Sequence, residues 1–272
     1  MIEAIIAGLF GLLIGSFLNV CIYRLPRDLS VVKPRSFCPN CEKPIAWYDN
    51  VPLLSYFVLA GRCRNCGQRI PVRYPLVELL TGAAFFTAFW ALGRTAVAMK
   101  YSVFGALLIT LIFSDLEERI LPDEFTLGGV ALGAVFAAFV PLNWGFMRLL
   151  LLSVQNRRVI SVAESLFAAV FCAGTLWLVG TLYQRIRHRE GLGLGDVKMV
   201  AMIGAFLGLE GALLTLIVGS LLGALVGLCY IWFTGKDAST YELPFGTFLG
   251  IAALGVAFIG EVFMTWYNRL GV

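Results

Sequence analysis

Two aspartates stand where apolar segments of this chain begin or end. Asp115 directly follows the apolar run 106–114, and Asp196 ends the glycine-rich segment 191–196 before another apolar run. A carboxylate at the middle of a membrane helix costs about 2.5–3.5 kcal/mol, so such residues are candidates for function. When two carboxylates face each other, the ionised one can activate a water while the protonated one polarises a carbonyl. The pair therefore predicts an aspartyl protease site.

The residues alone leave other functions open. A proton-coupled transporter could use the same two aspartates, and carboxylates such as Asp123 also cap helices where they leave a bilayer. The glycine-rich segment has the look of a nucleotide-binding loop, but no strand precedes it. His188 is the only histidine, which excludes a zinc protease built on two histidines, and no serine lies near it for a serine–histidine dyad.

Four cysteines form two CxxC pairs in the most polar part of the chain. The first pair is Cys38 and Cys41, and the second is Cys63 and Cys66, with 21 residues between the pairs. This spacing suits one tetrahedral zinc ion bound by four thiolates. Two disulfides or a redox pair are the alternatives, and a cytoplasmic location disfavours disulfides. Four sulfur ligands leave no position for water, so we expect a structural metal.

The composition places these residues in a membrane protein. Hydrophobic residues make up 59% of the 272 and charged residues only 14%, well below the charged fraction of about 25% in soluble domains. Basic residues are not interleaved with exposed aromatics, which argues against nucleic acid as a partner. We predict an all-α polytopic fold with about eight transmembrane helices and a small zinc-ribbon-like insertion. The expected spans are 2–22, 76–93, 97–114, 125–142, 161–182, 197–209, 211–233 and 245–267.

The domain boundaries and the orientation follow from the same pattern. We expect a first transmembrane helix at 1–23, a zinc-binding insertion at 24–75 and a membrane domain at 76–272 that carries the aspartates. With the N-terminus outside, the inner segments hold 15 of the 21 lysines and arginines, as the positive-inside rule requires. This orientation predicts a periplasmic N-terminus and aspartates that face the cytoplasm. The segment 143–160 is an interfacial helix candidate.

Taken together, these segments resemble the type IV prepilin peptidases of bacteria. The resemblance rests on motifs in a fixed order: 15–20, 23–26, both CxxC pairs with 50–56 between them, 73–82, Asp115 to Asp123, 191–198 and 243–246. It implies that Asp115 and Asp196 are the catalytic pair of an intramembrane protease in the bacterial inner membrane. The implied substrates are type IV prepilins or pseudopilins, whose leader is cleaved after a glycine on the cytoplasmic side.

The resemblance also implies a second activity and several supporting residues. Many members methylate the new N-terminal residue with S-adenosylmethionine, and we expect Glu78 and Asn19 to be candidates for that site. The expected substrate-binding or supporting residues are Gly193, Gly195, Lys198, Pro244 and Gly246. Two rival classes predict different results: a transporter would give ion flux without cleavage, and a zinc-ribbon scaffold would tolerate the loss of both aspartates.

Overall fold

The chain is built from helices. The computed structural model describes residues 1–142, 145–188, 192–234 and 243–269, with side chains up to Ile259. Within these residues the extended structure is limited to two isolated β-bridges, so the predicted all-α fold is confirmed. The chain divides into two compact units, Met1–Ser114 (unit 1) and Asp115–Val272 (unit 2). The domain boundaries at residues 23 and 75 remain predictions.

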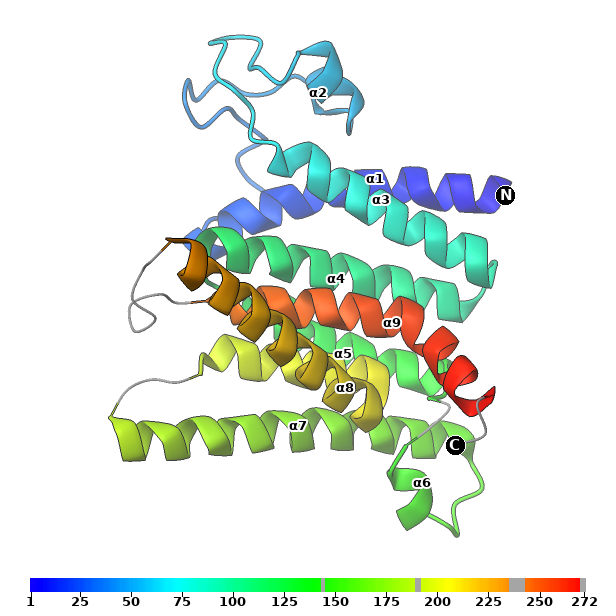
Figure 1. Ribbon diagram of the computed structural model, residues 1–272. Helices are drawn as coiled ribbons and strands as arrows, with labels where there is room; N and C mark the ends of the chain where they lie inside the picture. Colours follow the sequence, from blue (N-terminus) through cyan, green and yellow to red (C-terminus); the bar gives the residue numbers. More distant parts are fainter. Residues whose placement is uncertain (143–144, 189–191, 235–242, 270–272) are drawn as a thin grey trace. The chain divides into compact units, whose positions relative to one another are not determined.

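Unit 1 is based on two long helices that lie side by side. Helix α1 (Ile2–Arg24) packs along α3 (Arg73–Leu92) (Figure 1). Small residues make this approach possible, since a Cβ on Gly15 would lie 2.7 Å from the Cα of Glu78. Glycine at such contacts is typical of helices packed in membranes. The Asn19 side chain ties the pair by donating from Nδ2 to the Tyr74 carbonyl at 2.9 Å.

The insertion between α1 and α3 holds the cysteines. Its helical turns are η1 (Leu25–Arg27), η2 (Trp47–Asn50) and α2 (Leu54–Val58). Each CxxC pair sits in a tight hairpin closed by one β-bridge, Phe37 with Pro44 and Arg62 with Arg69. Helix α4 (Ala96–Glu118) follows α3 and runs from unit 1 into unit 2, so that Asp115 lies in its last turn.

Unit 2 is a bundle of helices arranged around α8, which is divided into two helical parts at Gly208. It contains α5 (Asp123–Phe139), α6 (Met147–Leu150), α7 (Arg157–Arg187), α8 (Leu194–Thr234) and α9 (Phe245–Arg269). Helix α8 contacts α5, α7 and α9 (Figure 1). Asp196 lies in the first turn of α8, and α9 begins directly after Pro244.

The number of membrane spans differs from the expected pattern. In the part of the chain that the structure describes, five helices are long and apolar enough to cross a membrane: α1, α3, α4, α7 and α8. Helix α9 has a shorter apolar part, Phe245–Ile259, and α5 has 17 residues. The expected spans 197–209 and 211–233 correspond to the two helical parts of α8, which the non-helical Gly208 divides. The count of eight spans is therefore not confirmed.

A glycine and a buried carboxylate explain the irregular middle of α8. Gly208 has a φ of 75° and a ψ of −176°, which breaks the helix and leaves the Leu209 amide without a helical partner. Glu164 of α7, only 1% exposed, accepts from this N–H at Oε1 over 3.1 Å. Its Oε2 accepts from the Met147 N–H at 2.8 Å and so fixes the start of α6. The segment 143–160, expected as an interfacial helix, contributes α6 and the start of α7, while residues 143 and 144 lie outside the described residues.

Candidate active site and metal centre

The structure brings Asp115 and Asp196 together in unit 2. Asp115 is 6% exposed at the end of α4, and Asp196 is partly exposed at the start of α8. Gly246, in the first turn of α9, lies against both. A Cβ on this glycine would be 3.3 Å from Cγ of Asp115 and 3.2 Å from Oδ1 of Asp196. Both carboxyl groups therefore lie against the same point at the start of α9.

Thr247 fixes the Asp115 carboxylate. Its backbone N–H donates to Oδ2 of Asp115 at 2.7 Å, and its hydroxyl donates to the same oxygen at 2.8 Å. The N–H belongs to the first turn of α9, where amides have no partner within the helix. A negative charge is also favoured near a helix N-terminus. Asp115 therefore accepts a hydrogen bond from a free amide in the first turn of α9. The two bonds from Thr247 in turn hold one oxygen of the carboxylate in a single position.

Two glycines around the start of α8 leave room around Asp196 and around its neighbour Leu121. A Cβ on Gly193 would lie 3.3 Å from Oδ2 of Asp196, and one on Gly195 would lie 3.2 Å from the Leu121 Cβ. Larger residues at either position would push against the carboxylate or against the α4–α5 connection. The first glycine of the motif, Gly191, lies outside the described residues.

Lys198 and Pro244 also lie near this centre, in different ways. The Lys198 ammonium pairs with both oxygens of Asp123, at 2.7 and 2.8 Å, which links the first turns of α8 and α5. Pro244 is buried immediately before α9. The sequence interpretation placed Lys198 near a substrate leader; in the structure its partner is a carboxylate of the protein. Its role toward a substrate stays a prediction.

Two residues of this centre were missed from the sequence. Thr247 follows the 243–246 motif directly, and that adjacency was the available signal. Leu121, which is 9% exposed, packs against both Gly195 and Gly246. Nothing in its residue type distinguishes it from the other leucines of the chain.

The four cysteines form a candidate metal centre in unit 1. The Sγ atoms of Cys38, Cys41, Cys63 and Cys66 all lie within 4.8 Å of one another. Zinc bound tetrahedrally at about 2.3 Å separates its sulfur ligands by about 3.8 Å. Sγ of Cys38 and Sγ of Cys66 are 3.8 Å apart. The geometry and the soft donor set therefore fit zinc.

The two hairpins that carry the cysteines have matching backbones. The Glu42 N–H donates to the Cys38 carbonyl at 2.8 Å, and the Gly67 N–H donates to the Cys63 carbonyl at 2.9 Å. Glu42 and Gly67, one residue after each pair, both have positive φ, 56° and 71°. Hydrogen bonds from the Gln68 backbone and the Asn40 side chain lower the pKa of the Cys66 thiol to about 6. These bonds favour the thiolate, which is the form that binds a metal.

An ion pair connects η2 to the second cysteine hairpin. Arg64 donates to both oxygens of Asp49, from Nε at 2.8 Å and from Nη2 at 2.6 Å. These hydrogen bonds hold the pKa of Asp49 below its usual value. The two-point geometry fixes the orientation of η2 as well as its distance from the hairpin.

Glu78 and Asn19, the candidates for cofactor binding, have partners within unit 1. Glu78 is 8% exposed, and its Oε2 accepts from the Leu53 N–H at 2.8 Å. Leu53 has a φ of 59°, so this bond supports an unusual backbone conformation before α2. Asn19 bonds to the Tyr74 carbonyl, while its Oδ1 is buried without a hydrogen bond. Their role toward a cofactor stays a prediction.

The fold and these sites define a class: a helical membrane protein with a paired-carboxylate centre in one unit and a four-cysteine metal centre in the other. Residues 9–92 match the family model for the bacterial peptidase A24 N-terminal domain, and residues 102–228 match the type IV leader peptidase family. The chain belongs to the type IV leader peptidase family.

Relatives of known name agree with this assignment. The chain is similar to proteins named prepilin leader peptidase/N-methyltransferase in several bacteria. The Myxococcus xanthus protein is 41% identical over 88% of this chain and 66% of its own length. The Legionella pneumophila protein is 35% identical over 97% and 93%, and that of Neisseria gonorrhoeae is 33% identical over 82% and 80%. No solved structure matches the chain significantly.

Loss of one cysteine ligand should remove the metal and loosen unit 1. We expect Cys63→Ser to lower the zinc content well below one ion per chain and to lower the unfolding temperature, because a structural metal contributes folding free energy directly. Cys229→Ser is the control, since Cys229 is exposed on α8 and is not part of the cluster. Elemental analysis and thermal unfolding in detergent measure both effects. One zinc per chain in Cys63→Ser would contradict the assignment.

A methyl group at Gly246 should disturb the aspartate pair. Gly246→Ala places a Cβ within 3.3 Å of both carboxyl groups, and displacement of catalytic groups by about 1 Å can reduce rates on the order of 100-fold. Gly255→Ala on the same helix is the control, because nothing lies within 4 Å of the added Cβ. Cleavage rates of a prepilin compare the two variants. Equal rates would show that the contact at Gly246 is unimportant.

Proposed function

We propose that this chain cleaves the leader peptide of type IV prepilins or pseudopilins with Asp115 and Asp196, and methylates the new N-terminus. The family membership and the names of the relatives support both activities. The observation that carries the catalytic assignment is the convergence of the two carboxylates on Gly246 at the start of α9. The chain is a polytopic membrane protein, and its location in the inner membrane follows from the family.

The proposed reaction is hydrolysis by two carboxyl groups with different protonation. The ionised carboxylate takes a proton from a water molecule, whose oxygen attacks the carbonyl carbon of the peptide bond after the leader glycine. The protonated carboxyl gives its proton to the carbonyl oxygen. The nitrogen then takes the proton that the first carboxyl received from water, the carbon–nitrogen bond breaks and the amine leaves. A hydroxyl of the tetrahedral intermediate returns its proton to the second carboxylate as the new carboxyl group forms, which restores the starting state of the pair. Because Asp115 is held by Thr247 and Asp196 by the glycine segment, little reorientation is needed during these steps.

The surroundings of the pair suggest how a substrate strand is admitted. Gly193 and Gly246 keep side chains away from the carboxyl groups on two sides. A peptide must lie extended to be cleaved, and glycines allow such a strand to approach the backbone. We assign Lys198 a supporting role through its pair with Asp123, which aligns the starts of α5 and α8.

The orientation in the membrane belongs to the same proposal. Lysines and arginines outside the spans favour a periplasmic N-terminus and a cytoplasmic insertion. Leader peptides of prepilins are then cleaved at the cytoplasmic face. Zinc held by Cys38, Cys41, Cys63 and Cys66 would cross-link the insertion, and S-adenosylmethionine would supply an activated methyl group for the second activity.

Removal of either carboxylate should abolish cleavage without unfolding the protein. Asp115→Asn and Asp196→Asn are expected to reduce the rate by roughly 100- to 10,000-fold, the range for loss of general acid–base catalysis. Glu124→Gln is the control, because Glu124 is an exposed carboxylate at the start of α5. The change in mobility of a prepilin on a gel gives the rate, and thermal unfolding in detergent confirms that each variant is folded. Cleavage at the normal rate by either asparagine variant would refute the catalytic assignment.

A further inference from the structure

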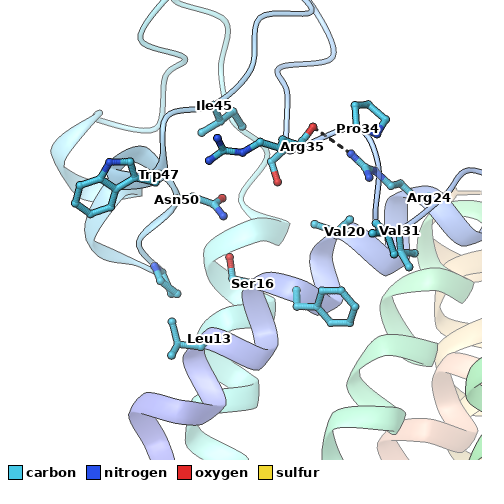
Figure 2. Close-up of a pocket in the computed structure, with 14 residues that line it drawn as sticks. Leu13, Ser16, Val20, Arg24, Val31, Pro34, Arg35, Ile45, Trp47 and Asn50 are labelled. Carbon is cyan, nitrogen blue, oxygen red and sulfur yellow. Dashed lines mark hydrogen bonds between the residues drawn. The ribbon is translucent and has the colours of Figure 1, made fainter.

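An open pocket of about 400 Å³ lies in unit 1 between α1 and the insertion (Figure 2). One face of α1 forms its floor, and the loops of the insertion form its walls. Its volume falls within the range of about 300–1,000 Å³ that is usual for small-molecule sites. The pocket lies wholly within unit 1 and contains neither aspartate, so the cleavage reaction does not account for it.

The pocket gathers residues from sequence motifs that cleavage does not use. Ser16 and Phe17 come from the motif 15–20, Arg24 from 23–26, and Asn50 and Pro52 from 50–56. These three motifs are separated along the chain, and the fold brings them to one cavity. Their convergence suggests that they share a ligand.

The lining combines an apolar floor, a cation and an exposed aromatic ring. Leu13 and Phe17 of α1 are 58% and 53% exposed. Figure 2 shows the Arg35 side chain extending from its loop toward Asn50 and Trp47. Within the described residues, Arg35 forms no ion pair with a carboxylate, and Trp47 is 74% exposed at the rim. A guanidinium binds a carboxylate at two points, and an exposed indole offers a face to a flat ring.

We propose that this pocket binds S-adenosylmethionine, with Arg35 pairing with the carboxylate of its methionine part and Trp47 stacking on its adenine. This inference rests on the proposed methylation activity and gives it a location. The ligand carries a carboxylate, an ammonium, a sulfonium and a flat adenine. In the pocket, the Arg35 guanidinium is placed for the carboxylate and the exposed indole of Trp47 for the adenine, above an apolar floor.

The walls of the pocket are held by contacts that do not involve the ligand. Arg24 is 4% exposed and donates to the Ser30 carbonyl at 2.8 Å and to the Arg35 carbonyl at 3.4 Å. It therefore anchors the loop that carries Arg35. The Asp49–Arg64 pair anchors η2, which carries Trp47 and Asn50. Arg24 is thus a positioning residue, whereas Arg35 is placed to touch the ligand.

Glu78 and Asn19 stabilise segments that form the pocket through hydrogen bonds to neighbouring backbone atoms. Glu78 holds the Leu53 amide next to Pro52, and Asn19 holds α1 against α3 one turn from Ser16. Neither residue lines the pocket. Both therefore contribute to the methylation site as positioning residues.

The position of the pocket suits an amine at the end of a membrane helix. Its floor belongs to a helix long enough to span the bilayer, and its walls belong to the polar insertion. The α-amine nitrogen of the cleaved substrate attacks the methyl carbon of the sulfonium group. The carbon–sulfur bond breaks with its electron pair going to sulfur, which leaves a neutral thioether, and the methylated ammonium releases one proton to water.

Binding of the methyl donor by the full-length protein tests this site directly. Equilibrium dialysis with labelled S-adenosylmethionine, in detergent and without substrate, gives the dissociation constant. We expect Arg35→Gln to weaken binding roughly 10- to 100-fold, as for the loss of a charge-assisted hydrogen-bonded pair, and to leave prepilin cleavage unchanged. Arg69→Gln is the matched control, because Arg69 is an exposed arginine of the second cysteine hairpin and does not line the pocket.

A second measurement addresses Trp47. Titration with S-adenosylhomocysteine should change the tryptophan fluorescence of the wild type, and this change should be lost in Trp47→Phe. Wild-type affinity in Arg35→Gln, from a protein that still yields methylated product, would overturn the location and leave the proposed function intact. Absence of methylated product from the wild type would instead contradict the proposed function.

Discussion

The structure of unit 2 depends on the burial of one carboxylate at the start of a helix. Asp115 is almost fully buried, and burial of a charge is unfavourable unless hydrogen bonds replace the lost water. Thr247 supplies two such bonds through the free amide of α9 and its own hydroxyl. Because this bond network joins α4 to α9, it also fixes Gly246, and Gly246 sets the distance to Asp196. Glu164 is a second buried carboxylate of this unit whose oxygens accept hydrogen bonds from free helix amides. One oxygen caps the start of α6, and the other caps the start of the second part of α8.

Unit 1 follows a different principle, because its insertion is too small for a large apolar core. The four cysteines of that insertion are placed to be cross-linked by one metal, and single polar contacts attach its loops to α1 and α3. The close packing of α1 on α3 through glycines provides the rigid base. A pocket between a rigid helix and tethered loops can hold a small ligand, whereas the paired carboxylates of unit 2 are suited to a peptide. In our proposal, the two activities therefore belong to two separately built sites.

Much of this could be predicted where the signal is local in the sequence. The spacing within each CxxC pair is compatible with only a few tight turns, so the metal cluster followed from Cys38 to Cys66 alone. The pairing of Asp115 with Asp196 was predicted because both residues end or begin an apolar run within recognisable motifs. The all-helical fold followed from the apolar runs themselves. These features need no knowledge of tertiary packing.

The remainder depends on contacts between residues that are distant in the chain. Thr247 donates to a carboxylate 132 positions away, and a threonine next to a helix start gives no sign of such a partner. The break between the expected spans 197–209 and 211–233 is found at Gly208, but the sequence contains no sign that Glu164 of α7 accepts from the Leu209 N–H that follows it. The pocket could not be predicted because its lining comes from α1 and from separate loops of the insertion, which only the fold brings together. For the same reason, the sequence did not show that Glu78 bonds to the Leu53 amide and Asn19 to the Tyr74 carbonyl, and their role toward a cofactor stays a prediction.

The central claim is that one chain cleaves a prepilin and methylates the product. Its most direct test is the intact mass of a purified prepilin after incubation with the purified protein, zinc and S-adenosylmethionine in detergent. The account predicts a product that has lost the leader peptide and gained about 14 Da, the mass of one methyl group in place of a hydrogen. A precursor of unchanged mass, with a substrate that a relative of this chain does process, would contradict the account.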